Sequence, residues 1–174
     1  MENDHDLIKL FQNGDNDAFD RLVRTHLSNT VGFFYAITRD KMVSEDLAQD
    51  VFFKLFKNLK KFRFKSAFKT YLYRINLNTA NSWFTRNKWK NYLGLDKIAD
   101  PVVIDTELEK DWLIKELWDA ISKLPTKQRN VVVMRIVEQL PYKEISLVTG
   151  IREGTAKVNF HHALKTLKDV LNYE

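Results

Sequence analysis

Residues 141–168 read "PYKEISLVTGIREGTAKVNFHHALKTLK", and this stretch decides the fold of the C-terminal part of the chain. Pro141 fits the first turn of a helix, and Gly150 supplies the left-handed residue that ends it. After the turn, a last helix is expected over about 153–170, because apolar residues recur there on one stripe that must face a core. The stripe consists of Ala156, Phe160, Ala163, Leu164 and Leu167. Two helices around a tight turn predict a helix-turn-helix.

The face of this last helix opposite the apolar stripe carries small, polar and basic side chains, which suits a helix that reads DNA. At about 100° per residue, that face comprises Val158, His161, His162 and Lys165, with Thr155 and Lys157 at its edges. The alternative is a surface helix that closes a bundle. The two neighbouring histidines diverge by about 100° around the helix, so a shared metal ion is not predicted.

Composition predicts an all-α chain. The 174 residues include only 5 glycines and 3 prolines, and apolar residues recur at the spacing of helices. The absence of cysteine excludes disulfides and thiolate chemistry. No apolar run reaches the length of about eighteen residues that would cross a membrane, and the acidic N-terminus lacks the layout of a signal peptide. A cytoplasmic location is therefore expected.

Charge is segregated along the chain. Residues 1–50 carry 5 basic and 10 acidic side chains, whereas residues 51–90 carry 11 basic and no acidic ones. Residues 91–119 carry 3 basic and 8 acidic side chains, and residues 120–174 carry 9 and 5. Two basic blocks separated by an acidic spacer predict two modules that contact polyanions.

Apolar spacing and stop signals divide the chain into two helical modules, residues 1–90 and residues 106–174. Between them, Gly94 and Pro101 interrupt a stretch without helical period, which predicts a linker at 91–105. In the first module, helices are expected near 4–13, 16–37, 44–60 and 66–88.

Capping residues set the expected helix ends. Ser44 is predicted to cap the third helix, with acidic residues following in its first turn. Thr106 and Glu109 form a capping-box pattern at the start of the second module, and Pro125 is expected to end one helix and begin the next.

The basic middle of the chain contains a segment without helical period, "KKFRFKSAF" at residues 60–68. Phe62 and Phe64 flank Arg63 in it. Rings interleaved with positive charge suit single-stranded nucleic acid, because phosphates need the charge and unstacked bases need a flat surface. The alternative is a loop that its two phenylalanines hold to the core. Both interpretations remain open from these residues.

The third predicted helix presents an apolar side chain on its polar face. Leu47, Val51, Leu55 and Leu59 form the stripe expected to be buried. Phe53 points away from that stripe, which suggests a protein partner, although single exposed apolar residues are common. Asp46 and Asp50 are one turn apart, but two carboxylates without a third ligand do not predict a metal site.

Three segments together carry a family resemblance. They are "SEDLAQDVFFKLF" at 44–56, "FRFKSAFKTYLYRINLNTANSW" at 62–83 and "LPTKQRNVVVMRIVEQLPYKEISLVTGIREGTAKV" at 124–158. In this order and spacing, the chain resembles bacterial RNA polymerase sigma factors of the small, two-domain extracytoplasmic-function (ECF) type. The resemblance covers nearly the whole chain except the linker.

The resemblance implies a role for each module. The first would bind the clamp helices of the polymerase β′ subunit and capture a base flipped from the minus-ten element, and the second would read the minus-thirty-five element and meet the β flap. The implied polymerase-binding residues are Asp46, Gln49, Asp50, Phe53 and Lys57. The implied minus-ten residues are Phe62, Arg63, Phe64, Lys65, Ser66, Phe68, Arg74 and Asn78. The implied minus-thirty-five residues are Arg135, Arg152, Thr155, Lys157, Val158, Asn159, His161, His162 and Lys165.

The family resemblance also implies an initiation factor without catalytic activity, cofactor or metal, an acidic linker directed to the polymerase channels, and an anti-sigma factor as partner. The chain departs from the family pattern at three positions. Tyr71 stands where Trp is usual, Arg152 where a Ser-like cap is common, and His162 where Arg is common. These departures leave the DNA sequence that is read open. The alternative function is a freestanding helix-turn-helix regulator that binds duplex DNA only.

Overall fold

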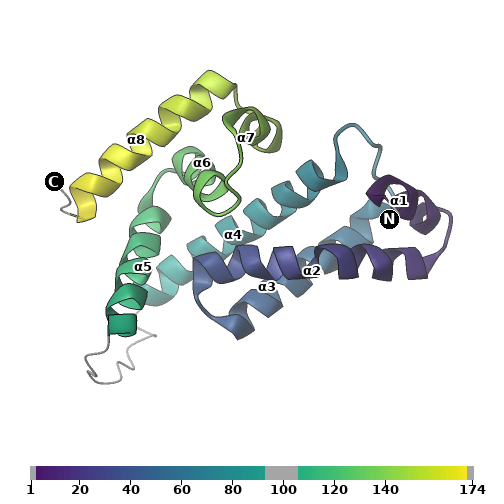
Figure 1. Ribbon diagram of the computed structural model, residues 1–174, viewed down its shortest axis with the longest axis horizontal. Coiled ribbons are helices and arrows are strands. Elements are labelled where there is room, and N and C mark those ends of the chain that lie inside the picture. The colour runs from purple at the N-terminus through teal and green to yellow at the C-terminus, as the bar shows by residue number, and fades with distance from the viewer. Residues whose placement is uncertain (1–2, 93–105, 172–174) are drawn as a thin grey trace. The chain divides into compact units, whose positions relative to one another are not determined.

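The computed structural model describes residues 3–92 and 106–171, and within them the chain is helical without any strand (Figure 1). The helices are α1 (Asp4–Gln12), α2 (Asn16–Thr38), α3 (Lys41–Leu59), α4 (Phe68–Tyr92), α5 (Thr106–Lys123), α6 (Thr126–Ile136), α7 (Tyr142–Thr149) and α8 (Glu153–Leu171). The all-α prediction is confirmed, and the predicted helix ends lie within a few residues of the observed ones.

The chain divides into two compact units, Met1–Ala80 and Asn81–Glu174, which are described separately below. The division falls inside α4. The predicted linker, 91–105, lies outside the described residues except for its first two positions, which belong to α4. The predicted domain boundaries therefore stay a prediction.

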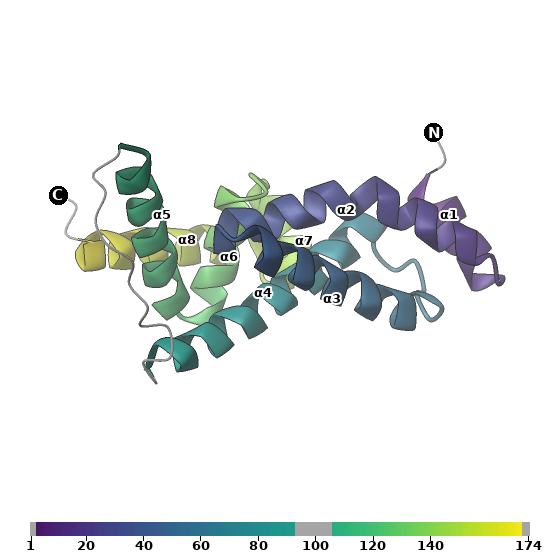
Figure 2. The same ribbon diagram turned by 90° about the horizontal axis from the view of Figure 1, so that it is seen from below.

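The N-terminal unit is built on α2 and α3, which lie side by side, with α1 against one end of α2 (Figure 2). The predicted apolar stripe of α3 faces this core, since Leu47, Val51, Leu55 and Leu59 are all buried. The largest fully buried side chains of this unit include Phe11, Leu22, Phe33 and Phe34. Burial of each such side chain contributes roughly 1.5–3 kcal/mol, so aromatic packing is a main source of stability here.

The start of α3 differs from the prediction. The helix begins at Lys41, and its cap is Asp40, whose side chain accepts a hydrogen bond from the backbone N–H of Val43. Ser44 is fully buried, and its hydroxyl donates to the carbonyl of Asp40 and lies 2.8 Å from the hydroxyl of Thr38. Ser44 thus stabilises the α2–α3 corner from inside the first turn, and the prediction of a Ser44 cap is wrong.

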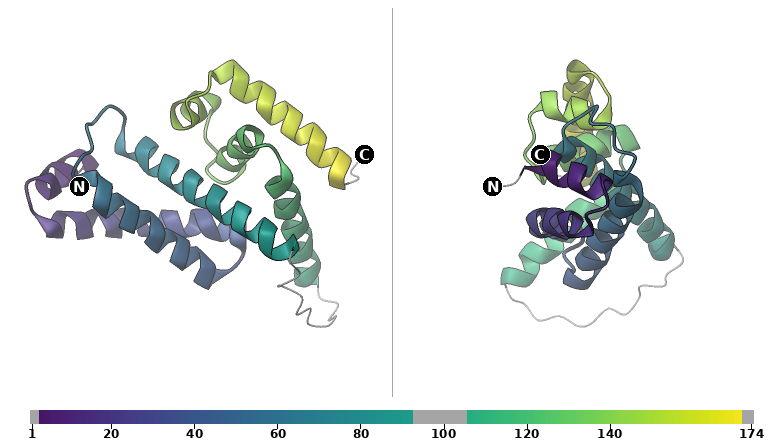
Figure 3. Two further views of the ribbon diagram at one scale, coloured as in Figure 1. Left: turned by 180° about the vertical axis from the view of Figure 1, so that it is seen from behind. Right: turned by 90° about the vertical axis from the view of Figure 1, so that its right-hand side faces the viewer.

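The C-terminal unit contains α6, α7 and α8, with α8 lying against both of the others and α5 meeting α8 and α6 (Figure 3). Pro125 and Pro141 immediately precede α6 and α7, and Gly150 ends α7 in the left-handed region at φ +76°, as predicted. Helix α5 begins at Thr106 as predicted, but the proposed cap of this helix lies outside the described side chains. Within α5 and α6, Arg129 is buried and donates through Nη1 to the carbonyl of Ser122, and burial lowers the pKa of this guanidinium.

The apolar stripe of α8 is narrower than predicted. Ala156, Ala163 and Leu167 are buried, Phe160 is half-buried, and Leu164 is 40% exposed. Leu164 lies about 80° around the helix from Ala156, whereas Ala163 and Leu167 lie within about 20° of it. The prediction that Leu164 faces the core is therefore wrong.

Candidate nucleic-acid and partner interfaces

Helices α7 and α8 form the predicted helix-turn-helix. The turn consists of Gly150, Ile151 and Arg152, and the side chain of Ser146 in α7 donates to the carbonyl of Ile151 at 2.6 Å. The carbonyl of Arg152 accepts the backbone N–H of Ala156 at 2.9 Å, so the first turn of α8 is formed although residue 152 is not a Ser-like cap. The turn is held from both helices.

The outer face of α8 carries the predicted side chains, and its apolar stripe leaves them free to face a ligand. Six of them are exposed on α8, namely Thr155, Lys157, Val158, His161, His162 and Lys165, and Arg152 is exposed in the turn before it. Asn159 is half-buried, and its side-chain amide donates to the carbonyl of Thr155 at 2.9 Å. An α-helix fits the major groove of B-DNA, so contact of these side chains with base edges stays a prediction.

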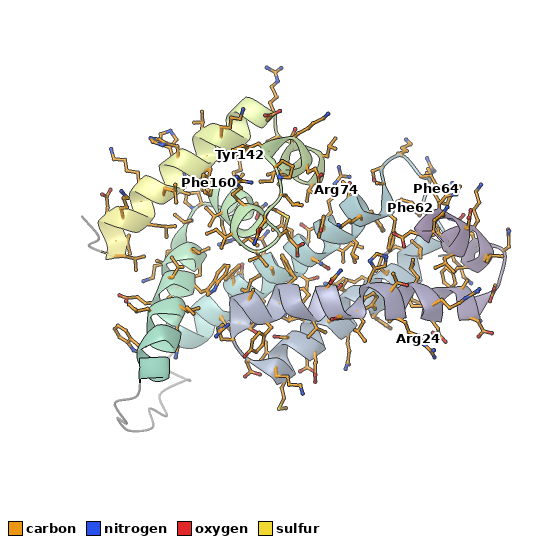
Figure 4. The ribbon with its side chains drawn as sticks, in the orientation of Figure 1. Arg24, Phe62, Phe64, Arg74, Tyr142 and Phe160 are labelled. Carbon is orange, nitrogen blue, oxygen red and sulfur yellow. The ribbon has the colours of Figure 1, made fainter. Side chains whose placement is uncertain are left out.

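A ring and cation cluster joins the start of α7 to α8. The rings of Tyr142 and Phe160 are 6.0 Å apart, and Figure 4 shows both labelled side chains between these two helices. The guanidinium of Arg135 lies 5.3 Å from the Tyr142 ring centroid and donates to the carbonyl of Leu140 at 3.0 Å. Arg135, one of the implied minus-thirty-five residues, is therefore already oriented by two protein groups.

Lys157 also has a partner that the sequence interpretation missed. Its Nζ lies 3.0 Å from Oε1 of Glu153, one turn earlier on the exposed face of α8. The i, i+4 spacing of Glu153 and Lys157 on a helix could have predicted this ion pair. Glu153 thus places a carboxylate among the side chains predicted to face DNA.

The loop between α3 and α4, residues 60–67, is called the α3–α4 loop below. Its rings form a cluster with two rings from α4: the Phe62 centroid lies 5.1 Å from that of Phe64, 6.5 Å from that of Phe68 and 5.0 Å from that of Tyr71. Phe68 is buried, and burial raises the pKa of Tyr71. The two loop rings are only half-buried, so they are held to the core and keep part of their surface open.

The polar residues of the α3–α4 loop alternate with its rings. Arg63 and Lys65 are exposed, and Ser66 is half-buried. Arg74, labelled in Figure 4, is exposed on α4, the helix that follows the loop. Asn78 is exposed on the same helix. The rings thus anchor the loop, as one interpretation predicted, and the cations are exposed; binding of single-stranded nucleic acid by this segment stays a prediction.

The outward face of α3 carries the five side chains predicted to bind a partner. Phe53 is 60% exposed, and Asp46, Gln49, Asp50 and Lys57 are exposed around it. Nζ of Lys57 lies 4.0 Å from the Phe53 ring centroid, a cation–π contact that holds the ring on the surface. Met42, which is 76% exposed, lies on the same face of α3, about three turns before Phe53. Met42 was not included in the predicted face, although its helical spacing from Phe53 predicts that position.

Within residues 3–92 and 106–171, no group of three or more His, Cys, Asp or Glu side chains could hold a metal ion. His161 and His162 have ring centroids 6.4 Å apart. No helix in the described part of the chain is long and apolar enough to span a bilayer.

A helix-turn-helix with an exposed polar face, a cationic loop that bears rings and an acidic helix face with an exposed ring are features typical of a DNA-binding transcription factor. The chain matches the Sigma-70 region 2 family model over residues 22–90 and the Sigma-70 region 4 model over residues 114–167, which together make up well over half of it. The chain belongs to the sigma-70 family of RNA polymerase sigma factors, as a member of the ECF type.

Relatives of similar length support this membership. The chain is 28% identical to the RNA polymerase sigma-H factor of Pseudomonas aeruginosa, over 98% of this chain and 95% of that one. It is also 28% identical to the ECF RNA polymerase sigma factor SigW of Bacillus subtilis, over 94% of each chain.

Two solved structures share the fold. CnrH in complex with the cytosolic domain of CnrY gives a TM-score of 0.66 at 20% identity, with 97% of both chains covered. The sigma factor RpoE in complex with the anti-sigma factor NepR, from Bartonella quintana, gives 0.58 at 19% identity, covering 90% of this chain and 98% of that one.

Proposed function

We propose that this chain is the promoter-specificity subunit that recruits RNA polymerase core to the promoters of one regulon and opens the DNA there. The observation that carries the proposal is the match to both sigma regions, in their proper order, on the two units that bear the candidate interfaces. The alternative from the sequence, a freestanding regulator that binds duplex DNA only, does not explain why the first unit matches sigma region 2. The chain therefore works within a polymerase holoenzyme, without catalytic chemistry of its own.

The two units divide the recognition of a promoter. The outer face of α8 reads the minus-thirty-five element as duplex, with each good base contact contributing roughly 1–3 kcal/mol. The α3–α4 loop captures a base flipped from the non-template strand of the minus-ten element, with Phe62 as the wall of the base pocket and Asn78 at its edge. Flipping costs a few kcal/mol of unstacking, so a preformed pocket offsets part of the cost of opening.

The α3 face around Phe53 meets the clamp helices of the polymerase β′ subunit. The ring of Phe53 becomes buried when the partner binds and anchors the interface. The side chains of Asp46, Gln49 and Asp50 around it supply the polar rim of that interface. The C-terminal unit meets the β flap. An anti-sigma factor is a further proposed partner, as in the complex of RpoE with NepR, and the cytoplasm is the proposed site of action.

Initiation by reconstituted polymerase tests the function. Core polymerase supplemented with the purified chain is expected to initiate at defined sites on genomic DNA of the source cell, because the chain supplies the promoter contacts that core lacks. Multi-round transcription followed by mapping of RNA 5′ ends measures this, with core alone as control. The same start sites with and without the chain would reject the function.

Glu153→Gln is expected to strengthen holoenzyme binding to duplex minus-thirty-five DNA several-fold. The substitution releases Lys157 from its 3.0 Å ion pair and removes a negative charge from the surface that meets phosphates. If Lys157 then contacts one more phosphate, the slope of log affinity against log salt becomes steeper by about 0.9. Anisotropy titrations of a labelled duplex at several salt concentrations measure both quantities.

Asp169→Asn is the matched control for this substitution. It makes the same change of charge on an exposed residue of α8, about 24 Å further along the helix axis. Its affinity and salt slope should equal those of wild type. An unchanged slope for Glu153→Gln would show that the pair does not restrain Lys157 from DNA.

A further inference from the structure

Gln12, the last residue of α1, makes one hydrogen bond to the end of α3 and one to the α3–α4 loop. Its Nε2 donates to the carbonyl of Leu59 at 3.0 Å and to the carbonyl of Phe62 at 2.9 Å. These acceptors are 47 and 50 residues away in the sequence, so one amide group joins segments that are far apart in the chain. The half-buried setting of Gln12 strengthens both bonds, because less water competes for the donor.

The second of these bonds is more than a helix cap. Leu59 ends α3, and its carbonyl also accepts the backbone N–H of Phe62 at 3.0 Å. A bond from Gln12 to Leu59 alone would add a second donor to a carbonyl at a helix end, where side chains commonly bond the last carbonyls. The bond to the carbonyl of Phe62 lies beyond the helix, within the loop. It fixes the peptide plane between Phe62 and Arg63, and with it the direction in which both side chains leave the backbone.

Helix α1 contacts the loop at two further points. The ring of His5 lies 4.6 Å from that of Phe64, centroid to centroid. Nζ of Lys60 lies 5.6 Å from the centroid of the Phe11 ring. Figure 4 shows Phe62 and Phe64 beside α1.

The backbone at Phe64 is strained. Its φ of +54° lies in the left-handed region, which a bulky side chain rarely adopts. Such a conformation persists only where the surroundings impose it. Here the His5 ring contacts the Phe64 ring itself, and Gln12 bonds the carbonyl of Phe62 two residues earlier. The loop is therefore held in a shape that its own sequence does not favour.

We propose that α1 braces the α3–α4 loop and that Gln12 is the positioning residue of this brace. This inference rests on the proposed function, since it concerns the loop that captures the flipped base. A loop held in one shape before DNA arrives loses little conformational entropy on capture, so the brace speeds opening without adding a contact to DNA. The match to region 2 begins at residue 22, after α1, so the matched region does not include the brace.

Limited proteolysis tests the brace without DNA. Gln12→Glu keeps the side-chain length but turns an oxygen toward two carbonyl oxygens, and Gln12→Met keeps the length with neither donor nor charge. Both variants are expected to be cleaved by trypsin after Arg63 and Lys65 about tenfold faster than wild type, because the loop opens locally. The melting temperature of the chain should change by only a few degrees.

Asn13→Asp is the control for Gln12→Glu, since it introduces the same charge at the exposed neighbouring residue. Its loop should be cleaved at the wild-type rate. Wild-type cleavage rates in both Gln12 variants would refute the brace. Faster cleavage throughout the chain, in place of the loop alone, would mean that Gln12 only stabilises the fold, and this result would also overturn the proposal.

Promoter opening tests the consequence. On the strongest start site found by transcription of genomic DNA, holoenzyme with Gln12→Glu should isomerise to the open complex about tenfold more slowly, with closed-complex affinity unchanged. If wild-type holoenzyme fails to open this DNA, the proposed function is wrong. If wild type opens it and the Gln12 variants open it equally fast, the inference alone is wrong.

Discussion

Phe62→Ala is expected to slow promoter opening by roughly 5- to 150-fold while leaving closed-complex binding nearly unchanged. The range follows from the loss of one base–ring stacking contact, which contributes roughly 1–3 kcal/mol. The contact forms only when a base has left the duplex, so it stabilises the open state and the path to it. In the proposed function, closed binding depends on α8 and the polymerase, which the substitution does not change.

Permanganate footprinting over time measures opening, and filter binding at low temperature measures the closed complex. Phe62 also packs against Phe64, Phe68 and Tyr71, so the melting temperature of the variant must be measured alongside. Phe62→Tyr keeps the flat ring and should restore most of the opening rate. Equal losses of closed binding and opening in Phe62→Ala would contradict the assignment of the flipped base to this loop.

The faces of α3 and α8 could be predicted from the sequence because helical periodicity alone determines them. The stripe from Leu47 to Leu59 had to be buried, and this left Phe53 outside whatever α3 packs against. The outer face of α8 followed in the same way. Leu164 was wrongly placed on the buried stripe of α8. It is 40% exposed because the neighbouring helices cover a narrower part of α8 than the apolar spacing predicts.

Features that depend on tertiary position could not be predicted. Both Asp40 and Ser44 are residue types that cap helices. Asp40 caps α3 and Ser44 is buried between α2 and α3, and the sequence alone does not show how these two helices pack at their corner. The bonds from Gln12 to Leu59 and Phe62 leave no local signal, because they depend on where the α3–α4 loop lies relative to α1. Of the two interpretations of Phe62 and Phe64, the structure bears on one: both rings are half-buried and pack against other rings, whereas their binding of single-stranded nucleic acid stays a prediction.

Phe53→Ala is expected to weaken binding to core polymerase by about 30-fold or more while leaving the fold intact. A ring at the centre of a protein interface commonly contributes 2 kcal/mol or more, because its surface is removed from water only when the partner is bound. In the free chain the ring is 60% exposed, so its removal should change the free energy of unfolding by no more than about 0.5 kcal/mol. Competition against a labelled wild-type chain for core polymerase measures the affinity.

Tyr35→Ala is the matched control for the polymerase surface. Tyr35 is a ring on α2 that is 43% exposed, and the guanidinium of Arg39 lies 5.2 Å from its centroid, much as Lys57 lies over Phe53. Its removal should leave polymerase affinity unchanged, because it is not on the face of α3. Holoenzyme formed at saturating Phe53→Ala should open promoters at the wild-type rate, which separates recruitment on α3 from base capture in the loop. Wild-type affinity for Phe53→Ala, or an equal loss with Tyr35→Ala, would mean that polymerase does not bind the face around Phe53.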